Sequence, residues 1–528
     1  MKIFHLITII LASLAIVSCS KKKKGDYNLD PKETLRVNIT TEPPSLDWNK
    51  STDTTSAQIQ DNIMEGLVEY DFSDPDLGLV GAIAKKWSAE NDATDWTFEL
   101  KKNVKWTDGI ELTAQHFIDG WQRLLNPLTA SEYAYFLYGI KGAREYNQGK
   151  IKDFAKVEAK AVDKYTIKVK LVGPQSYFPY LLTHHCTYPI RKEIIEKFGD
   201  NWTDPKNIVT NGPFKLKTWD HDKAIVLERN EIYYGEKPKI KNVLAYMIPE
   251  MSTAINLFDK GQIDAQLTLP STELSVLKKR EEHLESGILS LYYYGFNVKK
   301  KPMDNPLVRK AISLAINRNE VTKMLAGGQI PLTSWVPPGM FGYEAEIGTG
   351  FDIEKANKLL DEAGFKDRSK LQTITLGFNT NENHQRIAEN VQAQLKKNLG
   401  INVELKNEEW KVYLNTLKVD PPHVFRMGWL ADYPDPDNFL NLMTSYSDNN
   451  HTNWGNKDYD SLIEDAAKEL DKGKRKDIYS KAQKILTELD VPVAPVFSSV
   501  VHSLVAKRVI NFPNNSMNRY QYKRVELK

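Results

Sequence analysis

The stretch of the chain that decides the fold is Phe425-Arg426-Met427-Gly428-Trp429-Leu430-Ala431-Asp432-Tyr433-Pro434. It places one carboxylate, that of Asp432, inside an apolar and aromatic run that has the character of a strand and that Pro434 ends. Burying an unpaired charge costs several kcal/mol, so Asp432 requires either a fixed Lys or Arg or a cation that arrives with a ligand. The second case would make the stretch part of a binding site. The alternative from these residues alone is that Asp432 caps a turn before Pro434.

The composition is that of a globular protein long enough for more than one domain. The chain has 528 residues, of which 41% are hydrophobic and 27% are charged. Its 71 Lys and Arg residues nearly balance its 69 Asp and Glu residues, so we expect no nucleic-acid partner. The aromatic content of 10% suits either large cores or a cleft that grips a ligand through flat side chains.

The N-terminus has the pattern of an export signal. Lys2 precedes an apolar run, Ile3 to Val17, that is short for a membrane span. Ser18 and Cys19 follow, and a small residue before cysteine resembles the lipobox of bacterial lipoproteins, in which the thiol takes a diacylglyceryl group. We therefore predict a lipoprotein signal peptide over residues 1–19, with a membrane-anchoring lipid on Cys19. A plain secretory signal or an uncleaved anchor is the alternative, and in each case the rest of the chain is exported.

The segment after Cys19 is polar and charged, so we predict a solvated tether over residues 20–34. With lipid on Cys19, the second cysteine, Cys186, has no intrachain partner. The body must then be stable without a disulfide in an oxidising compartment.

Strand and helix patterns interleave along the whole chain. Alternating apolar residues predict half-buried strands at 35–39, 96–100, 165–171 and 401–405. Helical spacing predicts helices at 308–316, 356–363, 387–395, 459–470 and 477–489, with Gly364 and Gly400 as left-handed caps of the second and third. A strand or crossover is expected at 491–501, and extended pieces follow to Lys528. Helix, glycine and apolar strand in succession form the unit of layered α/β domains, so the fold class is α/β.

The sequence contains no complete catalytic or metal-binding set. It lacks a Gly-x-Ser-x-Gly nucleophile elbow and a phosphate-binding loop. His184-His185-Cys186 could suggest a soft metal ligand set, but no second His or Cys cluster lies at ligand-like spacing, which favours a structural role. The acids of 432–437 resemble a calcium-binding loop, but the central Gly and the terminal Glu of such a loop are missing. The same acids leave open the alternative of a glycosidase that uses two carboxylates. We predict a binding protein rather than an enzyme, with no metal and no cofactor.

Many motifs, in order from about Leu35 to the C-terminus, resemble those of the family 5 extracellular solute-binding proteins, which include the peptide-binding proteins of oligopeptide ABC importers. The residues that carry the resemblance are Trp87, Trp96-Thr97-Phe98-Glu99-Leu100, Lys105-Trp106-Thr107-Asp108-Gly109, Leu112-Thr113-Ala114, Trp121-Gln122-Arg123, Asn207-Ile208-Val209-Thr210-Asn211-Gly212, Arg309-Lys310-Ala311-Ile312, Asn407-Glu408-Glu409-Trp410 and Gly428-Trp429-Leu430-Ala431-Asp432-Tyr433.

The resemblance implies a two-lobed periplasmic-binding-protein fold with a hinge, an additional inserted domain and a ligand buried between the lobes. Lobe I would combine residues 35–64, 188–289 and 500–528. The inserted domain II would take residues 65–187, and lobe III residues 290–499.

The resemblance also implies a ligand site. The family's aspartate that binds the α-ammonium group of a peptide matches Asp432, and such a ligand supplies the cation that the local sequence requires. By the same resemblance, main-chain groups of Thr54, Leu430 and Tyr293 hold the peptide as an added strand, Tyr133, Trp410 and Trp429 line its side-chain pockets, and Arg426 and His384 meet its carboxylate. Core packing is the alternative for the aromatic residues. Pocket acids of some relatives correspond to Thr52 and Gly295, so a preference for lysine-rich peptides is not supported.

We therefore predict a membrane-anchored receptor, facing the periplasm or the cell exterior, that captures oligopeptides and delivers them to the membrane subunits of an ABC permease. We expect it to be a monomer. One alternative is a receptor of the same fold for a murein peptide, a sugar or a metal chelate. Another is a secreted hydrolase that uses the acids of 432–437.

Overall fold

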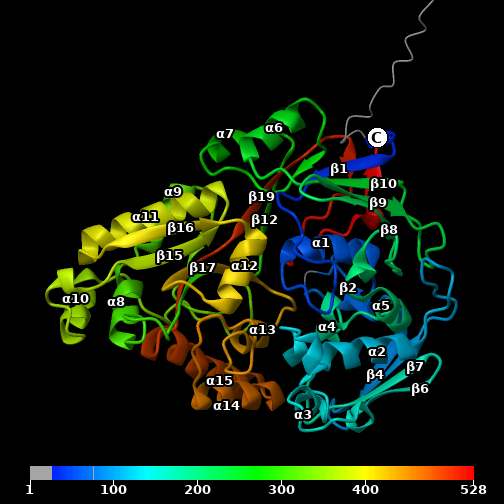
Figure 1. Ribbon diagram of the computed structural model, residues 1–528, viewed down its shortest axis with the longest axis horizontal. Helices are drawn as coiled ribbons and strands as arrows, with labels where there is room; N and C mark the ends of the chain where they lie inside the picture. Colours follow the sequence, from blue (N-terminus) through cyan, green and yellow to red (C-terminus); the bar gives the residue numbers. More distant parts are fainter. Residues whose placement is uncertain (1–26, 75) are drawn as a thin grey trace, which may run out of the picture.

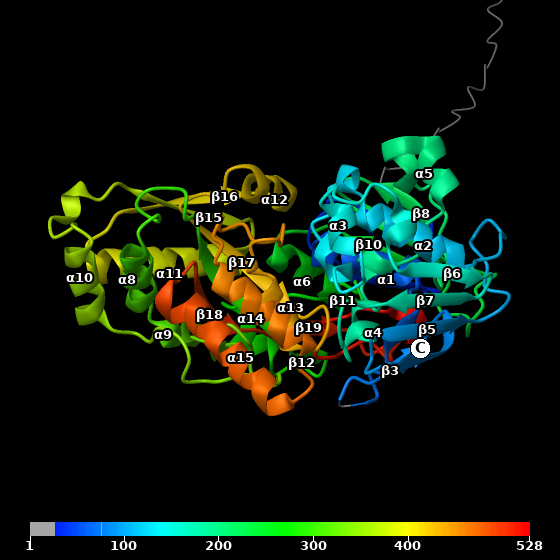
Figure 2. The same cartoon turned by 90° about the horizontal axis from the view of Figure 1, so that it is seen from below.

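Two mixed sheets, each covered by helices, form the centres of the two halves of the molecule (Figures 1 and 2). The computed structural model describes residues 27–74 and 76–528. The predicted signal peptide, Cys19 and the start of the predicted tether lie outside these residues. The α/β fold class is confirmed by this alternation of strands and helices.

The first sheet has seven strands in the order β12-β19-β11-β1-β10-β9-β8. Their bounds are β1 (Thr34–Asn38), β8 (Phe214–Asp220), β9 (Ala224–Arg229), β10 (Asn242–Tyr246), β11 (Ala265–Gln266), β12 (His283–Gly287) and β19 (Val500–Val505). The expected strand at 35–39 is present as β1, but its half-buried character is wrong. β1 lies between β10 and β11, and even its polar Thr34 and Asn38 are buried, with the Asn38 amide donating to Gln266 at 2.9 Å.

The second sheet has six strands in the order β14-β18-β13-β17-β15-β16. Their bounds are β13 (Ser290–Phe296), β14 (Ile330–Pro331), β15 (Ile374–Asn379), β16 (Val403–Glu408), β17 (Val424–Leu430) and β18 (Val493–Ser498). Apolar residues of β13, β15 and β18 form one core with those of the helices α8 to α11. The decisive stretch of the sequence thus lies inside a sheet, in β17.

A third, antiparallel sheet of four strands is formed by β4 (Ala84–Glu90), β5 (Asp95–Leu100), β6 (Ala159–Asp163) and β7 (Thr166–Lys170), in the order β4-β5-β7-β6. Two short pairs complete the strands: β2 (Val68–Tyr70) with β3 (Leu79–Gly81), and β20 (Val509–Ile510) with β21 (Glu526–Leu527). The strands expected at 96–100, 165–171 and 401–405 correspond to β5, β7 and β16.

The α-helices are α1 (Thr54–Ile63), α2 (Ala114–Leu125), α3 (Ala143–Asn147), α4 (Phe178–Leu181), α5 (Lys192–Phe198), α6 (Met251–Asp259), α7 (Leu274–Leu277), α8 (Pro306–Ala315), α9 (Arg318–Leu325), α10 (Ile353–Glu362), α11 (Glu382–Leu399), α12 (Trp410–Val419), α13 (Pro436–Asn441), α14 (Lys457–Lys468) and α15 (Lys472–Lys484). Gly364 and Gly400 follow α10 and α11 with φ of 90° and 70°, so both expected left-handed ends are confirmed. None of the helices in the described part of the chain has the length and apolarity needed to cross a membrane.

The chain passes between the two large sheets at two closely spaced places. β12 leads through residues 288–289 into β13, and β18 leads through Ser499 into β19. β12 and β19 pair with each other and lie between the two halves in both ribbon views (Figures 1 and 2). The predicted boundaries of lobes I and III and of domain II stay a prediction.

Residues 27–34 differ from the predicted tether. Tyr27 and Leu29 pack against Ala224, Val226 and Leu244 on the first sheet. The apolar side chains gain more from burial than from solvation, so this part of the segment follows the sheet surface.

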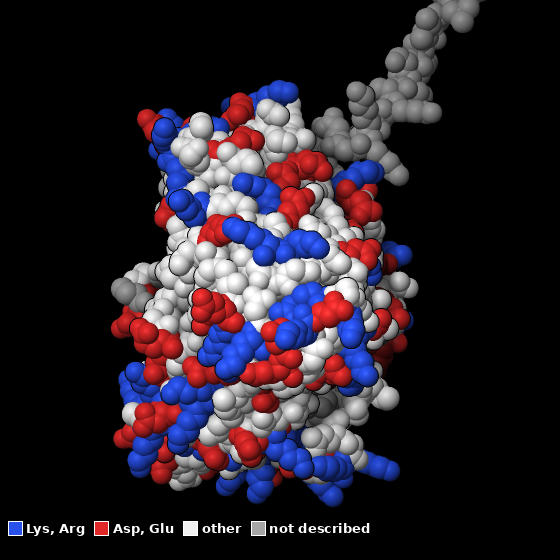
Figure 3. Space-filling model, turned by 90° about the vertical axis from the view of Figure 1, so that its left-hand side faces the viewer, with Lys and Arg blue, Asp and Glu red and all other residues white. Residues whose placement is uncertain are grey.

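Charges are mixed on the surface. On the face shown in Figure 3, Lys and Arg side chains are interspersed with Asp and Glu, as the nearly equal totals of 71 and 69 lead one to expect. Cys186 is fully buried and has no disulfide partner among the described residues.

Candidate functional site

Two adjoining cavities lie where the two halves of the molecule meet. The first, of about 240 Å³, is lined by the segment from Arg426 to Asp432, by the start of α1 and by residues 517–520. The second, of about 540 Å³, contains His384 and shares six lining residues with the first. The shared residues are Thr54, Gln58, Trp410, Arg426, Asn518 and Tyr520. Together the cavities have the size of small-molecule sites, which is roughly 300–1,000 Å³.

One edge of β17 is open to the first cavity. β17 pairs along its whole length with β13 on one side, from Val424↔Phe296 to Leu430↔Ser290. On the other side β15 pairs only with Val424 and Phe425. From Arg426 to Leu430 this second side therefore has no strand neighbour in the described part of the chain, and every residue from Arg426 to Asp432 lines the cavity. The Arg426 carbonyl accepts from Tyr413 Oη at 2.6 Å, whereas unpaired main-chain groups along such an edge can accept an extended peptide as an added strand.

Asp432 stands just beyond the end of this edge, and its carboxylate is held by three groups. Tyr133 Oη donates to Oδ2 at 3.4 Å and Asn438 Nδ2 at 3.1 Å, while His184 Nε2 lies 3.3 Å from Oδ1. The Asp432 side chain is 13% exposed. Burial, and next the negative Asp432, raise the pKa of Tyr133 well above its usual range, so this phenol stays a neutral donor.

No Lys or Arg of the described chain forms an ion pair with Asp432. The guanidinium group of Arg519 lines the same cavity, but it donates to Asp61 at 2.7 Å, and Asp61 is itself only 3% exposed. His184 balances Asp432 only when its imidazole carries a second proton. A partly buried carboxylate that pairs with no Lys or Arg among the described residues is suited to bind a cationic group of a ligand.

Asn438, on α13, orients this corner of the site. Its Oδ1 accepts from the Asp432 main-chain N–H at 3.0 Å and from Trp429 Nε1 at 2.9 Å, while its Nδ2 donates to the Asp432 carboxylate. Tyr70 Oη donates to the Asp432 carbonyl at 2.9 Å from the other half of the molecule. Asn438 is not among the predicted site residues, although its place six residues after Asp432, at a helix start, is a local signal.

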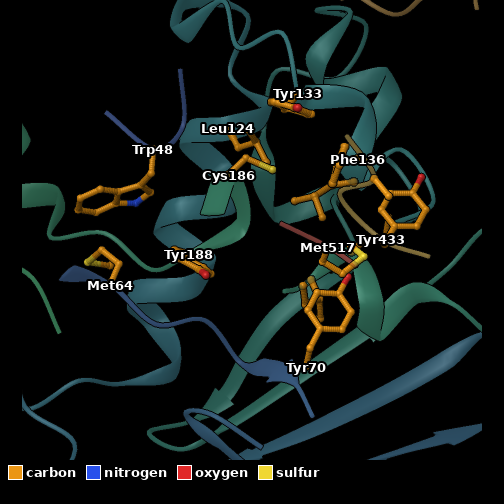
Figure 4. Packing of buried hydrophobic residues seen from close by; sticks show 14 of the residues in the cluster. Trp48, Met64, Tyr70, Leu124, Tyr133, Phe136, Cys186, Tyr188, Tyr433 and Met517 are labelled. Atoms are coloured by element: carbon orange, nitrogen blue, oxygen red, sulfur yellow. The ribbon is translucent and has the colours of Figure 1, made fainter. Parts of the chain in front are cut away.

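Aromatic rings surround the Asp432 carboxylate. Tyr133 packs edge-on against Phe136 with 4.8 Å between the ring centroids, and Phe136 packs in the same way against Tyr433 at 5.6 Å. The three residues belong to the buried cluster drawn in Figure 4. Trp429 is 6% exposed and lies 6.2 Å from Tyr133. These side chains limit the access of water to the carboxylate, which strengthens its interactions.

Arg426 and His384 lie together around Tyr292. The guanidinium group of Arg426 is 4.7 Å from the Tyr292 ring centroid and donates to Asn379 at 3.0 Å. The His384 ring is 5.6 Å from Tyr292, and burial, with Arg426 as the smaller cause, lowers its pKa well below the usual range. Arg426 Nε and His384 Nδ1 are buried polar atoms without a hydrogen-bond partner in the described structure. Both residues line the second cavity, and both side chains carry N–H groups that can donate to an anionic group of a ligand.

All the predicted ligand-binding residues except Tyr293 line one of the two cavities. Tyr293 lies in the middle of β13, between Met427 of β17 and Pro495 of β18, and its ring packs on Trp335 at 4.9 Å. A residue flanked by two strands has its main-chain groups in the ladders. Tyr293 lines neither cavity, whereas Tyr292 lines the first, so a main-chain contact of Tyr293 with a peptide stays a prediction.

The neighbouring acids have other roles. Asp435, not Asp432, caps a helix: its side chain accepts from the Asp437 N–H at the start of α13, and it pairs with Arg475 at 2.8 Å. Asp437 is 3% exposed, and its burial, followed by the charge of Asp435, raises its pKa to about 6. His184, for which the sequence favours a structural role, contacts Asp432.

An α/β fold with two halves and ligand-sized cavities between them defines the class of two-lobed solute-binding proteins. The family model of the bacterial extracellular solute-binding proteins, family 5 (middle), matches residues 78–451, and the chain belongs to this family. It is therefore a solute-binding protein and not an enzyme.

Known proteins of similar sequence and structure agree with this assignment. The oligopeptide-binding protein OppA of Bacillus subtilis is 36% identical over 507 residues, which are 93% of this chain and 92% of the relative. A crystal structure of a periplasmic oligopeptide-binding protein of Borrelia burgdorferi has a TM-score of 0.90 at 32% identity and covers 94% of this chain and 100% of its own. The two-lobed family 5 fold is confirmed by this similarity.

The arrangement of the two halves differs from that of a known open form. The structure of the Escherichia coli murein tripeptide-binding protein MppA has a TM-score of 0.90 at 32% identity, with coverage of 94% of this chain and 99% of its own. The unliganded open form of MppA, at the same identity and with coverage of 94% and 98%, has a TM-score of only 0.64. The halves of this chain are therefore not placed as in that open form.

Proposed function

We propose that this protein captures oligopeptides between its two halves and delivers them to an ABC permease. The observation that carries the proposal is the combination of a partly buried Asp432, which has no Lys or Arg partner among the described residues, with the open edge of β17 beside it. The carboxylate would bind the ammonium group at the start of the peptide, and the strand edge would bind its main chain.

The spacing of the charged groups supports a short peptide. Asp432 and Arg426 are six positions apart along an extended segment, which corresponds to about 20 Å between their Cα atoms. Because both side chains reach toward the ligand, a strand of about three to five residues would fit between them. Main-chain pairing gives affinity for any sequence, and the aromatic lining supplies apolar contact with varied side chains.

The relatives support a peptide ligand. OppA of Bacillus subtilis and the Borrelia burgdorferi protein are oligopeptide-binding proteins, and the latter belongs to an oligopeptide ABC transporter. Other relatives bind a murein peptide or, for a probable deoxycholate-binding protein of Escherichia coli, a steroid. A peptide carries an ammonium group that can pair with Asp432, whereas a steroid or a sugar carries no cation. The Asp432 carboxylate therefore favours a peptide ligand.

The proposed location rests on the N-terminal motif. Export by the signal peptide 1–19 and lipid on Cys19 would hold the protein at a membrane surface, facing the periplasm or the cell exterior. Mass spectrometry of the intact protein from membranes tests this part: a diacylglyceryl mass on Cys19 supports it, and a chain cleaved elsewhere without lipid contradicts it.

Native mass spectrometry of the freshly purified protein tests the ligand class. We expect co-purified species whose masses and fragments correspond to peptides of a few residues. A sugar, a bile acid or a metal chelate as the bound species would contradict the peptide proposal while leaving the binding-protein fold intact.

A further inference from the structure

Three side chains with metal-ligand chemistry meet on the paired strands β12 and β19, outside both cavities. His283 and Glu285 are two residues apart on β12, so they lie on the same face of the sheet. His502 stands directly opposite Glu285 across the ladder. One donor atom from each of the three lies within 4.8 Å of the other two.

The distances between these donor atoms suit a tetrahedral ion. His283 Nε2 is 3.1 Å from His502 Nδ1, and Glu285 Oε2 is 3.5 Å from the same nitrogen. Two ligands bound at 2.0–2.1 Å to a tetrahedral Zn²⁺ are about 3.3 Å apart. Small side-chain movements would therefore bring all three atoms to one ion.

A hydrogen bond fixes the orientation of His502. Its Nε2 lies 2.6 Å from the Gly327 carbonyl oxygen, which can only accept, so Nε2 carries the proton. The lone pair of Nδ1 then faces His283 and Glu285. This is the arrangement by which protein carbonyls orient metal-binding histidines. His502 is 6% exposed, whereas the Glu285 side chain is 48% exposed and leaves access for an ion and a water ligand.

The same side chains also have contacts with one another and with Lys278 that require no metal, and these contacts would compete with metal binding. The two imidazoles can share a hydrogen bond, and Lys278 Nζ pairs with Glu285 Oε2 at 3.3 Å. The Lys278 side chain is 30% exposed and could turn into solvent. Its charge opposes a bound cation, so its removal should tighten metal binding.

We propose that His283, Glu285 and His502 form a site for a divalent transition-metal ion of the Zn²⁺ type, with water completing its shell. Two imidazoles and one carboxylate suit Zn²⁺, Ni²⁺ or Cu²⁺, whereas Ca²⁺ and Mg²⁺ prefer oxygen ligands. The site stands a few residues from both places where the chain passes between the large sheets. A metal on Nδ1 would also fix the His502 tautomer that donates to Gly327, in the loop before β14 of the other sheet. The ion would thereby strengthen the link between the two halves.

Calorimetry of the untagged protein with ZnCl₂, after removal of metals by a chelator, tests the proposal. We expect one Zn²⁺ per chain, with affinity at least tenfold weaker in His283→Gln and about tenfold weaker in Glu285→Gln. Lys278→Met should bind severalfold more tightly. His221→Gln is the matched control, because His221 also contacts a carboxylate, Glu42 at 2.5 Å, but belongs to no cluster of three metal-ligand side chains among the described residues.

The absorption spectrum of bound Co²⁺ supplies a second measurement. Intense tetrahedral bands are expected for the parent protein and not for His283→Gln. Circular dichroism without metal checks that each variant is folded. If His283→Gln is not folded, the variant Glu285→Gln, which changes an exposed residue, takes its place in the test. Unchanged Zn²⁺ affinity in both variants, or no binding by the parent protein, would overturn the proposal. Peptide binding is not needed for either measurement, so its outcome is separate from that of the proposed function.

Discussion

Replacement of Asp432 by asparagine is the most informative change at the proposed ligand site. The amide keeps the size of the side chain and can still contact Tyr133 and Asn438, but it removes the charge. A peptide ammonium group placed here would then lie in a largely buried pocket with no counter-charge.

The expected loss of affinity can be estimated from two contributions. At pH 7 the ligand can shed its α-amino proton, at a cost of about 1.4 kcal/mol for a pKa near 8. The charge-assisted hydrogen bond that is lost contributes about 1.5–3 kcal/mol more. Together these give about 3–4 kcal/mol, which corresponds to a loss of about 10²- to 10³-fold in affinity.

Calorimetry with trialanine and N-acetyl-trialanine separates the charge effect from a general loss of binding. We expect the parent protein to prefer the free peptide by about 10²-fold or more, and Asp432→Asn to bind both peptides with similar, weak affinity. Glu409→Gln is the control, since Glu409 is an acid that lines the second cavity. If Asp432→Asn retains the parent's preference for the free peptide, the reasoning is refuted.

Three further predictions concern charges in or near the site. Arg426→Met should weaken binding of peptides with a free carboxylate by about 10- to 100-fold and leave amidated peptides unaffected, as competition binding would measure; equal effects on both would contradict it. Arg519→Met leaves Asp61 buried without its 2.7 Å partner, so urea unfolding should show a loss of about 3–5 kcal/mol, and unchanged stability would disprove this. Burial raises the pKa of Asp437 to about 6 from its usual 3.8, so its stabilising contribution is present at low pH and is lost as pH rises through 6. The unfolding free energy relative to Asp437→Asn should therefore fall by about 2 kcal/mol between pH 4 and pH 7, and a constant or rising difference would refute the assignment.

Local patterns predicted those parts of the fold that depend on local physics. Gly364 and Gly400 end helices in the left-handed conformation, because glycine adopts positive φ without strain. Alternating apolar residues located β5 and β7, because successive side chains of a strand point to opposite faces of the sheet. The prediction that β1 is half-buried was wrong, because a central strand can bury its polar residues when they form hydrogen bonds with partners such as Gln266.

The site was only partly visible in the sequence. Asp432 stands out because a charge interrupts an apolar strand, and this can be read locally. His184 cannot be found in this way, because its contact with Asp432 joins segments far apart in the chain. The sequence also does not show that β13, which contains Tyr293, has strands on both sides.

A crystal structure of the protein with a bound tripeptide tests the central claim most directly. We expect the ligand's terminal nitrogen within hydrogen-bond distance of the Asp432 carboxylate and its main chain paired with the edge from Arg426 to Leu430. A peptide whose amine binds elsewhere, or an Asp432 already paired with a lysine or arginine of the protein, would contradict the account.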